Sequence, residues 1–227
     1  MTHLDIELKN LRTDVVDMFL LTGSQLEKSK EALIRLEKDL AREVLVNEKR
    51  VNAFELKIDR DCENIIALFN PVAIDLRFVL ACLKINSNLE RIGDIAEGIS
   101  QFVLNIRIEP DPKLLETTRM IEMFDTGIQM MKDVQQAFDQ EDTILARGVF
   151  QKDEVMDQIN MNANQAVADF ILANTDRINQ SLYLLSSIRK LERLGDQCKN
   201  IAEEIIFYLE AKVLKHKHRN HPNNDGR

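Results

Sequence analysis

An eleven-residue segment occurs twice in this chain, and this repetition restricts its fold more than any other feature. "LERIGDIAEGI" occupies residues 89–99 and "LERLGDQCKNI" occupies residues 191–201. Upstream of these segments, "LAREVLVNEKRVN" at 40–52 is similar to "LARGVFQKDEVMD" at 145–157. Repeats of this length are typical of a supersecondary unit that is present in two copies. We therefore expect two similar halves with the same order of elements.

The apolar pattern predicts helices throughout both halves. The chain has no Trp, seven Gly and four Pro, which is too few turn formers and aromatic residues for a protein rich in strands. Apolar residues recur at spacings of three and four between breakers near Pro71, Pro110 and Thr175. This pattern predicts an all-α protein with six long helices, over about 5–40, from the "KDLAREV" turn to about 69, then 73–107, 113–139, 142–173 and 177–214.

Three helices in each half indicate two antiparallel three-helix bundles, because a single helix cannot bury its apolar face alone. We expect the first bundle over residues 1–108, the second over 113–214, and a polar tail over 215–227 that is disordered in part. The histidines of the tail offer metal capture as an alternative, but a solvated tail is favoured. Four methionines of the fourth predicted helix are expected to fill the core rather than form a docking surface. They are Met120, Met123, Met130 and Met131.

Charge and composition exclude several classes of function. A net charge of −8 argues against nucleic-acid binding, which requires Lys and Arg to neutralise phosphates. The chain lacks a run of about 18 apolar residues, and its first residues include acids where a secretory signal has basic ones, so we expect a cytoplasmic location. Cys62, Cys82 and Cys198 form no C-x-x-C pair and are expected to be buried thiols, with metal ligation as the minor alternative.

A glycine interrupts each repeated segment, and acidic residues surround it. Gly93 and Gly195 each cost a helix about 1 kcal/mol relative to alanine, so another requirement must keep them. At about 100° per residue, the acids of each repeat project away from the apolar stripe, and the preceding helix carries an acidic row beside its own stripe. Antiparallel pairing would bring the two rows level in both halves. The candidate ligands are Glu48, Glu55, Glu90 and Asp94 in the first half, and Asp153, Asp157, Glu192 and Asp196 in the second.

Paired acidic rows favour a bound cation. Ionised carboxylates at close range repel one another by about 1 kcal/mol per pair even in water, and a multivalent cation removes that penalty. Oxygen ligands suit Mg²⁺, Mn²⁺ and Fe³⁺, and the absence of nearby histidines makes a zinc-specific site the weaker alternative. A second alternative is a solvated acidic face that is partly neutralised by Arg91 or Arg193.

The same residues resemble the PhoU family of phosphate-uptake regulators. The resemblance rests on "LERIGDIAE" and "LERLGDQCKNIAE", on "VNEKRVNAFELKIDRDC" followed by "NPVAIDLR", and on "KDEVMD" in the second half. It extends in register from about residue 8 to 210. It implies two pseudo-symmetric three-helix bundles with surface clusters of several iron or zinc ions on E(D)-x-x-x-D motifs, at the eight acids named above.

The resemblance also implies a function that the residues alone do not reveal. PhoU-like proteins act in the cytoplasm as negative regulators of the phosphate regulon, between the ATPase subunit of the Pst phosphate transporter and the sensor kinase PhoR. We therefore expect a non-enzymatic adaptor, peripheral to the membrane through its partners only, and a homodimer. Asn52 stands where the second half has Asp157, and Gly98 where it has Asn200, so we expect the first site to bind metal more weakly.

Two other classes of function remain as alternatives. A di-iron enzyme would place Glu-x-x-His pairs inside a four-helix core, whereas the four histidines of this chain lie outside any such motif. A metal-free helical adaptor would use its acidic rows only for solubility or for contacts with other proteins. Its role would then be in another signalling pathway.

Overall fold

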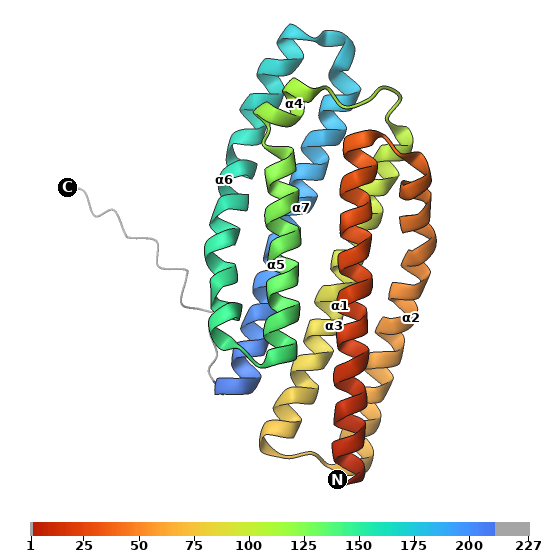
Figure 1. The fold of residues 1–227 in the computed structure, drawn as a ribbon, viewed down its shortest axis with the longest axis vertical. Helices are drawn as coiled ribbons and strands as arrows, with labels where there is room; N and C mark the ends of the chain where they lie inside the picture. Colours follow the sequence, from red (N-terminus) through yellow and green to blue (C-terminus); the bar gives the residue numbers. More distant parts are fainter. Residues whose placement is uncertain (1, 212–227) are drawn as a thin grey trace, which may run out of the picture.

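The computed structural model describes residues 2–211, and within this range every regular element is helical. Figure 1 shows two groups of long helices side by side, with the first half of the chain in one group and the second half in the other. The elements are α1 (His3–Arg35), α2 (Lys38–Phe69), α3 (Ala73–Asn105), α4 (Pro112–Thr117), α5 (Met120–Gln140), α6 (Thr143–Ala173), the 3₁₀ turn η1 (Thr175–Arg177) and α7 (Ile178–Glu210). The all-α prediction is confirmed.

The first turn comes four residues earlier than the sequence predicts. α1 ends at Arg35, and the turn consists of Leu36 and Glu37 rather than the polar residues near 40. Leu36 adopts a left-handed conformation with φ of 52°, and its N–H donates to the carbonyl of Ala32. Such a helix end usually carries Gly or Asn. A leucine at this position gives no local signal, so the periodic pattern extended the helix too far.

The predicted helix over 113–139 is wrong as a single element, because the chain breaks it after Thr117. Arg119 has φ of 53°, and its N–H bonds to the carbonyl of Glu116. The hydroxyl of Thr118 donates to the carbonyl of Leu114 at 2.6 Å, which closes the last turn of α4. The described residues therefore contain the six long helices that the sequence predicts and, in addition, the short helix α4.

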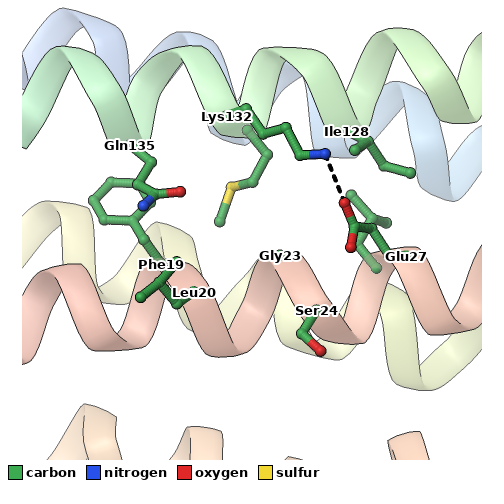
Figure 2. Close-up of a pocket in the computed structure, with 10 residues that line it drawn as sticks. Phe19, Leu20, Gly23, Ser24, Glu27, Ile128, Lys132 and Gln135 are labelled. Carbon is green, nitrogen blue, oxygen red and sulfur yellow. Dashed lines mark ion pairs between the residues drawn. The ribbon is translucent and has the colours of Figure 1, made fainter.

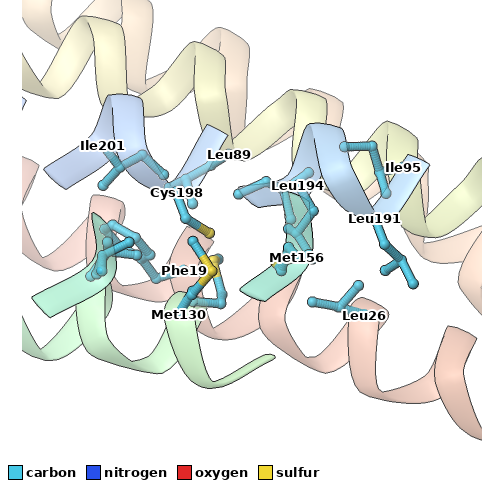
Figure 3. Packing of buried hydrophobic residues seen from close by; sticks show 14 of the residues in the cluster. Phe19, Leu26, Leu89, Ile95, Met130, Met156, Leu191, Leu194, Cys198 and Ile201 are labelled. Carbon is cyan, nitrogen blue, oxygen red and sulfur yellow. The ribbon is translucent and has the colours of Figure 1, made fainter. Parts of the chain in front are cut away.

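One apolar core extends across both halves. α3 packs against α7 and α1 against α5, in addition to the contacts within each half. Figure 3 shows Phe19 and Leu26 of α1, Leu89 of α3, Met130 of α5 and Leu194 of α7 in the same cluster. All five are at most 1% exposed. The central helices α3 and α7, which carry the repeated segment, are therefore held firmly between the outer helices.

The linker between the halves is fixed by one buried side chain. Gln180 of α7 is 7% exposed, and its amide donates to the carbonyls of Ile108 and Glu109, each at 2.8 Å. Its side-chain oxygen accepts the N–H of Asp111 at 3.2 Å. Asp111 in turn caps α4 by accepting the N–H of Lys113. The linker is therefore ordered against the second half.

A narrow groove lies between α1 and α5, where the two halves meet. It encloses a cavity of about 160 Å³, and Figure 2 shows Leu20 and Gly23 on one wall and Ile128 on the other. Lys132 and Glu27 form an ion pair of 2.7 Å across it. Its mostly apolar lining comes from α1 and α5, which carry none of the candidate carboxylates.

Several smaller predictions can be compared with the structure. Cys62, Cys82 and Cys198 are free and buried, as expected. The four methionines at 120, 123, 130 and 131 are buried in the core, which confirms their packing role. No helix within residues 2–211 is long and apolar enough to cross a membrane. The predicted polar tail at 215–227 lies outside the described residues.

Candidate metal sites on paired helices

The first acidic cluster lies where α2 and α3 pack against each other. The two predicted acidic rows face each other, because, besides burial, the negative charges of four acids from both helices raise the pKa of Glu48. These acids are Asp94, Glu97, Glu90 and Glu55. Glu90 is half-buried and Asp94 is exposed, so the cluster opens to solvent on the side of α3. The antiparallel pairing predicted from the Pro71 turn thus places Glu55, Glu90 and Asp94 within electrostatic range of Glu48.

Glu48 is the unusual member of this cluster. The sequence placed it beside the apolar stripe, but its residue is only 5% exposed, and neither carboxylate oxygen has a hydrogen-bond partner among the described residues. Burial and then the neighbouring Asp94 and Glu97 raise the pKa of Glu48 to about 7. A buried carboxylate without a partner is costly, because nothing replaces the water that the charge has lost. Glu48 is therefore the residue that a cation would stabilise most.

The glycines of the two repeats make room for these buried acids. A Cβ at Gly93 would lie 3.0 Å from Oε2 of Glu48 and 3.0 Å from Cγ1 of Val51. A Cβ at Gly195 would lie 2.5 Å from Oδ1 of Asp153. Contacts of this length require the neighbour to move. The expectation that each glycine permits a close approach is confirmed, and the approaching group is a carboxylate of the adjacent helix.

The second cluster has the same layout on α6 and α7 but contains its own cation. Asp153 is 4% exposed and faces Gly195, as Glu48 faces Gly93. Lys199 forms a short ion pair with Asp153, and its Nζ lies 2.9 Å from Oδ1 of Asp196. Burial raises the pKa of Asp153, while Lys199 opposes that shift. Burial alone would lower the pKa of Lys199, but its two carboxylate partners raise it above the usual value.

The remaining candidates of the second half also adjoin the buried Asp153. Asp157 is exposed and Glu192 is half-buried. Burial, then Asp196, Asp157 and Asp153, raise the pKa of Glu192. All four predicted acids of this half therefore lie within electrostatic range of one another, as Glu55, Glu90 and Asp94 do of Glu48 in the first half.

Two further residues belong to these clusters but were not among the predicted ligands. Glu97 lies three positions after Asp94 and raises the pKa of Glu48, and Lys199 lies three positions after Asp196. Helical geometry places Glu97 on the same face as Asp94, and antiparallel pairing sets Lys199 level with Asp153, but neither consideration shows which way the side chains point. The two repeats thus place opposite charges at equivalent positions.

Asn200 of α7 corresponds to Gly98 of α3, and its side chain contacts the other half of the chain. Its amide donates to Oδ1 of Asn88 on α3 at 3.3 Å and so links the two halves. At Gly98, an added side chain would meet the end of the Lys190 side chain. The substitution of glycine for asparagine therefore reflects packing between the halves.

The first cluster fits a hard cation better than the second does. Within residues 2–211, no three His, Cys, Asp or Glu side chains are already arranged as a metal site. Carboxylates that repel one another stay apart until a cation draws them together, so the exposed members must rotate toward Glu48. In the second half, the Lys199 ammonium already lies between the acids of α6 and α7.

Comparisons with known proteins agree with the duplicated architecture. A family model described as the PhoU domain matches residues 15–103 and again residues 120–205. Two similar proteins are the phosphate-specific transport system accessory protein PhoU of Edwardsiella tarda, 33% identical over 92% of this chain and 86% of that protein, and the PhoU homolog of Caulobacter vibrioides, 34% identical over 92% and 90%.

Solved structures give the same result. The chain superposes on PhoU from Pseudomonas aeruginosa with a TM-score of 0.87 at 27% identity, covering 92% of this chain and all of that one. The phosphate transport system regulatory protein PhoU from Streptococcus pneumoniae gives a TM-score of 0.81 at 26% identity, covering 93% and 99%. The domain occurs twice, and each copy carries one of the acidic clusters described above, so this chain belongs to the PhoU family.

Proposed function

We propose that this chain is the accessory protein of a phosphate-specific transport system and a negative regulator of the phosphate regulon. Relatives that match over nearly the whole chain carry the name of phosphate-specific transport system accessory protein. The single observation that carries the proposal is the match of one domain model to both halves of the chain, at residues 15–103 and 120–205, which include the acidic clusters of both helix pairs. In this role the chain is a non-enzymatic adaptor in the cytoplasm.

The proposed partners are the ATPase subunit of the Pst transporter and the sensor kinase PhoR. The fold supports an adaptor role because its described cavities lie in grooves between helices, and the acidic clusters open to the surface through exposed members such as Asp94 and Asp157. Docking that depends on phosphate needs only a small energetic difference. A change of about 1.4 kcal/mol in binding free energy alters the ratio of bound to free protein tenfold.

Metal binding at the carboxylate clusters is part of this proposal. The unpartnered, buried Glu48 supports it in the first half, where the chain supplies five neighbouring acids. They are Glu48, Glu55, Glu90, Asp94 and Glu97. Iron or zinc is the candidate that the family resemblance implies, while donors that are all oxygen atoms suit Fe³⁺, Mn²⁺ and Mg²⁺ better than zinc. A bound metal would neutralise the buried charge and fix α2 against α3.

A gene deletion tests the regulatory role. In phosphate-rich medium, loss of the gene should derepress a reporter of phosphate uptake, and the wild-type gene should restore repression. Pull-down with the transporter ATPase and the kinase tests the adaptor role, and light scattering tests the proposed homodimer. Unchanged reporter activity in the deletion strain would show that the chain is not a negative regulator.

A metal-free adaptor is the second candidate, and the lack of a preformed metal site within residues 2–211 favours it. Elemental analysis of untagged protein separates the two. Metal that is present in the wild type and absent after Glu48→Gln with Asp94→Asn supports the metal-binding form. Repression that survives in this double variant, together with full partner binding, would support the metal-free adaptor.

A further inference from the structure

The two halves of this chain are not equivalent toward cations. Residues of α3 correspond to residues of α7 that lie 102 positions later, so that Gly93 matches Gly195 and Asp94 matches Asp196. The same offset matches Glu97 with Lys199. Several positions of the two acidic faces differ, such as Asn52 and Asp157, but only this pair places a carboxylate in the first half and an ammonium group in the second.

The structure shows that Lys199 is directed into the cluster rather than into solvent. Its ammonium contacts Asp153 of α6 and Asp196 of α7, and thus bridges the helix pair as a metal ion would. Its side chain is 27% exposed, whereas the carboxylate of Asp153 is almost fully buried. The second half therefore has a cation at the position where its buried acid needs one.

The first half has no such group. Among the described residues, no lysine or arginine forms an ion pair with the acids at 48, 55, 90, 94 or 97, and both oxygens of Glu48 are unpartnered. With all five acids ionised, this cluster has a formal charge of −5, and Arg91, which opposes the rise that burial causes in the pKa of Glu90, forms no ion pair with that carboxylate. The second cluster has four acids and Lys199, which gives −3.

We propose that Lys199 is a built-in cation that closes the second cluster to metal, so that only the first cluster, centred on Glu48, binds a hard metal ion. A tethered ammonium competes with a dissolved metal as an intramolecular ligand, with an effective concentration that reaches the millimolar range for short tethers. It also reduces the charge that attracts a divalent ion. The inference rests on the proposed metal binding, and it reverses the order of affinities that the sequence suggested.

The experiment measures binding of Mn²⁺ to metal-stripped, full-length protein by equilibrium dialysis and electron paramagnetic resonance. Amide variants remove each cluster with little change in shape: Glu48→Gln with Asp94→Asn for the first, and Asp153→Asn with Asp196→Asn for the second. We expect the first pair to abolish tight Mn²⁺ binding and the second pair to leave it within about twofold of wild type.

Two charge exchanges test the role of position 199 directly. Lys199→Gln should create a second class of Mn²⁺ site. Glu97→Lys should weaken the original site by at least about tenfold, because it places an ammonium group where the second half has one. The control is Lys30→Gln, which removes a lysine of α1 that pairs with Asp125 of α5, on two helices that carry none of the candidate carboxylates, and should not alter Mn²⁺ binding.

The two charge-exchange variants differ in how strongly they threaten folding. Lys199→Gln leaves Asp153 without its partner, so circular dichroism must show that this variant is folded, whereas Glu97→Lys relieves repulsion and should fold at least as well as wild type. Equal Mn²⁺ binding by both clusters in the wild type would overturn the inference, and so would Glu97→Lys with unchanged affinity. No Mn²⁺ binding in the wild type would overturn it as well, while the reporter test of phosphate regulation would still stand independently.

Discussion

Replacing Gly195 with alanine should destabilise this protein, although alanine is the better helix former. The added Cβ would lie 2.5 Å from Oδ1 of Asp153 and 3.3 Å from Sδ of Met156. Asp153 is 4% exposed and paired with Lys199, so it cannot withdraw without losing that contact. Overpacking of this kind costs about 1–3 kcal/mol, and the ion pair is weakened in addition.

The gain in helix propensity offsets part of this cost. Alanine is favoured over glycine by about 1 kcal/mol in a helix interior, so the net loss should be about 1–2 kcal/mol. For a protein of this size that corresponds to a fall in Tm of about 2–4 °C per kcal/mol. Gly148 of α6 is the matched control, since a Cβ there meets nothing within 4 Å. Gly148→Ala should stabilise by about 0.5–1 kcal/mol.

Urea unfolding monitored by circular dichroism measures both variants, with the midpoint and the slope m compared with wild type. A double-mutant cycle with Asp153→Ala isolates the contact, because the cost of Gly195→Ala should largely vanish once the carboxylate is gone. If Gly195→Ala proves as stabilising as Gly148→Ala, the glycine does not serve to admit the Asp153 carboxylate. A double-mutant cycle that shows no coupling energy between the two substitutions would lead to the same conclusion.

Three further predictions concern buried polar groups. Because the pKa of Glu48 is raised in the folded protein, the folded state binds this proton more tightly than the unfolded chain does, and the free energy of unfolding falls as the pH rises from about 4.5 to about 7. With a chelator present, Glu48→Gln should therefore be more stable than wild type at pH 8 and equally stable at pH 4. Equal stability of the two proteins at pH 8 would contradict this. Tyr208→Phe should change the free energy of unfolding by less than about 1 kcal/mol, because the buried hydroxyl lies beside the Arg12 guanidinium but makes no well-formed hydrogen bond among the described residues, and a thermal melt that shows a larger loss would refute this. Gln180→Ala removes three hydrogen bonds to the linker and should cost about 1–3 kcal/mol, with faster hydrogen exchange or proteolysis near residues 108–111 as the second measurement.

Periodicity predicted most of the helices because their apolar stripes are long and regular. The breaks at Asn70 and Asn174 were visible through Pro71 and the polar residues near Thr175. The breaks at Leu36 and Arg119 were not, since both residues take left-handed conformations that their side chains do not favour. Tertiary packing, rather than local preference, fixes these two turns.

The candidate clusters were predictable in outline for a similar reason. Helical geometry and antiparallel pairing suffice to place two acidic rows beside each other. They do not determine depth, because a residue about 60–120° from an apolar stripe can be buried or exposed, depending on the neighbouring helix. Glu48 is buried only because Gly93 leaves space for it, which becomes evident once α2 and α3 are in contact. The role of Lys199 likewise depends on the direction of its side chain, which helical geometry alone does not determine.

The shared core implies that neither half of the chain is an independent module. α3 and α7 bury apolar side chains against each other across the boundary between the repeats, and α1 does the same with α5. A polypeptide that ended after the first repeat would expose this surface to water and would have to cover it with another copy of itself. Unfolding of the intact chain should accordingly be a single cooperative transition, and a destabilising substitution in one repeat should lower the stability of both.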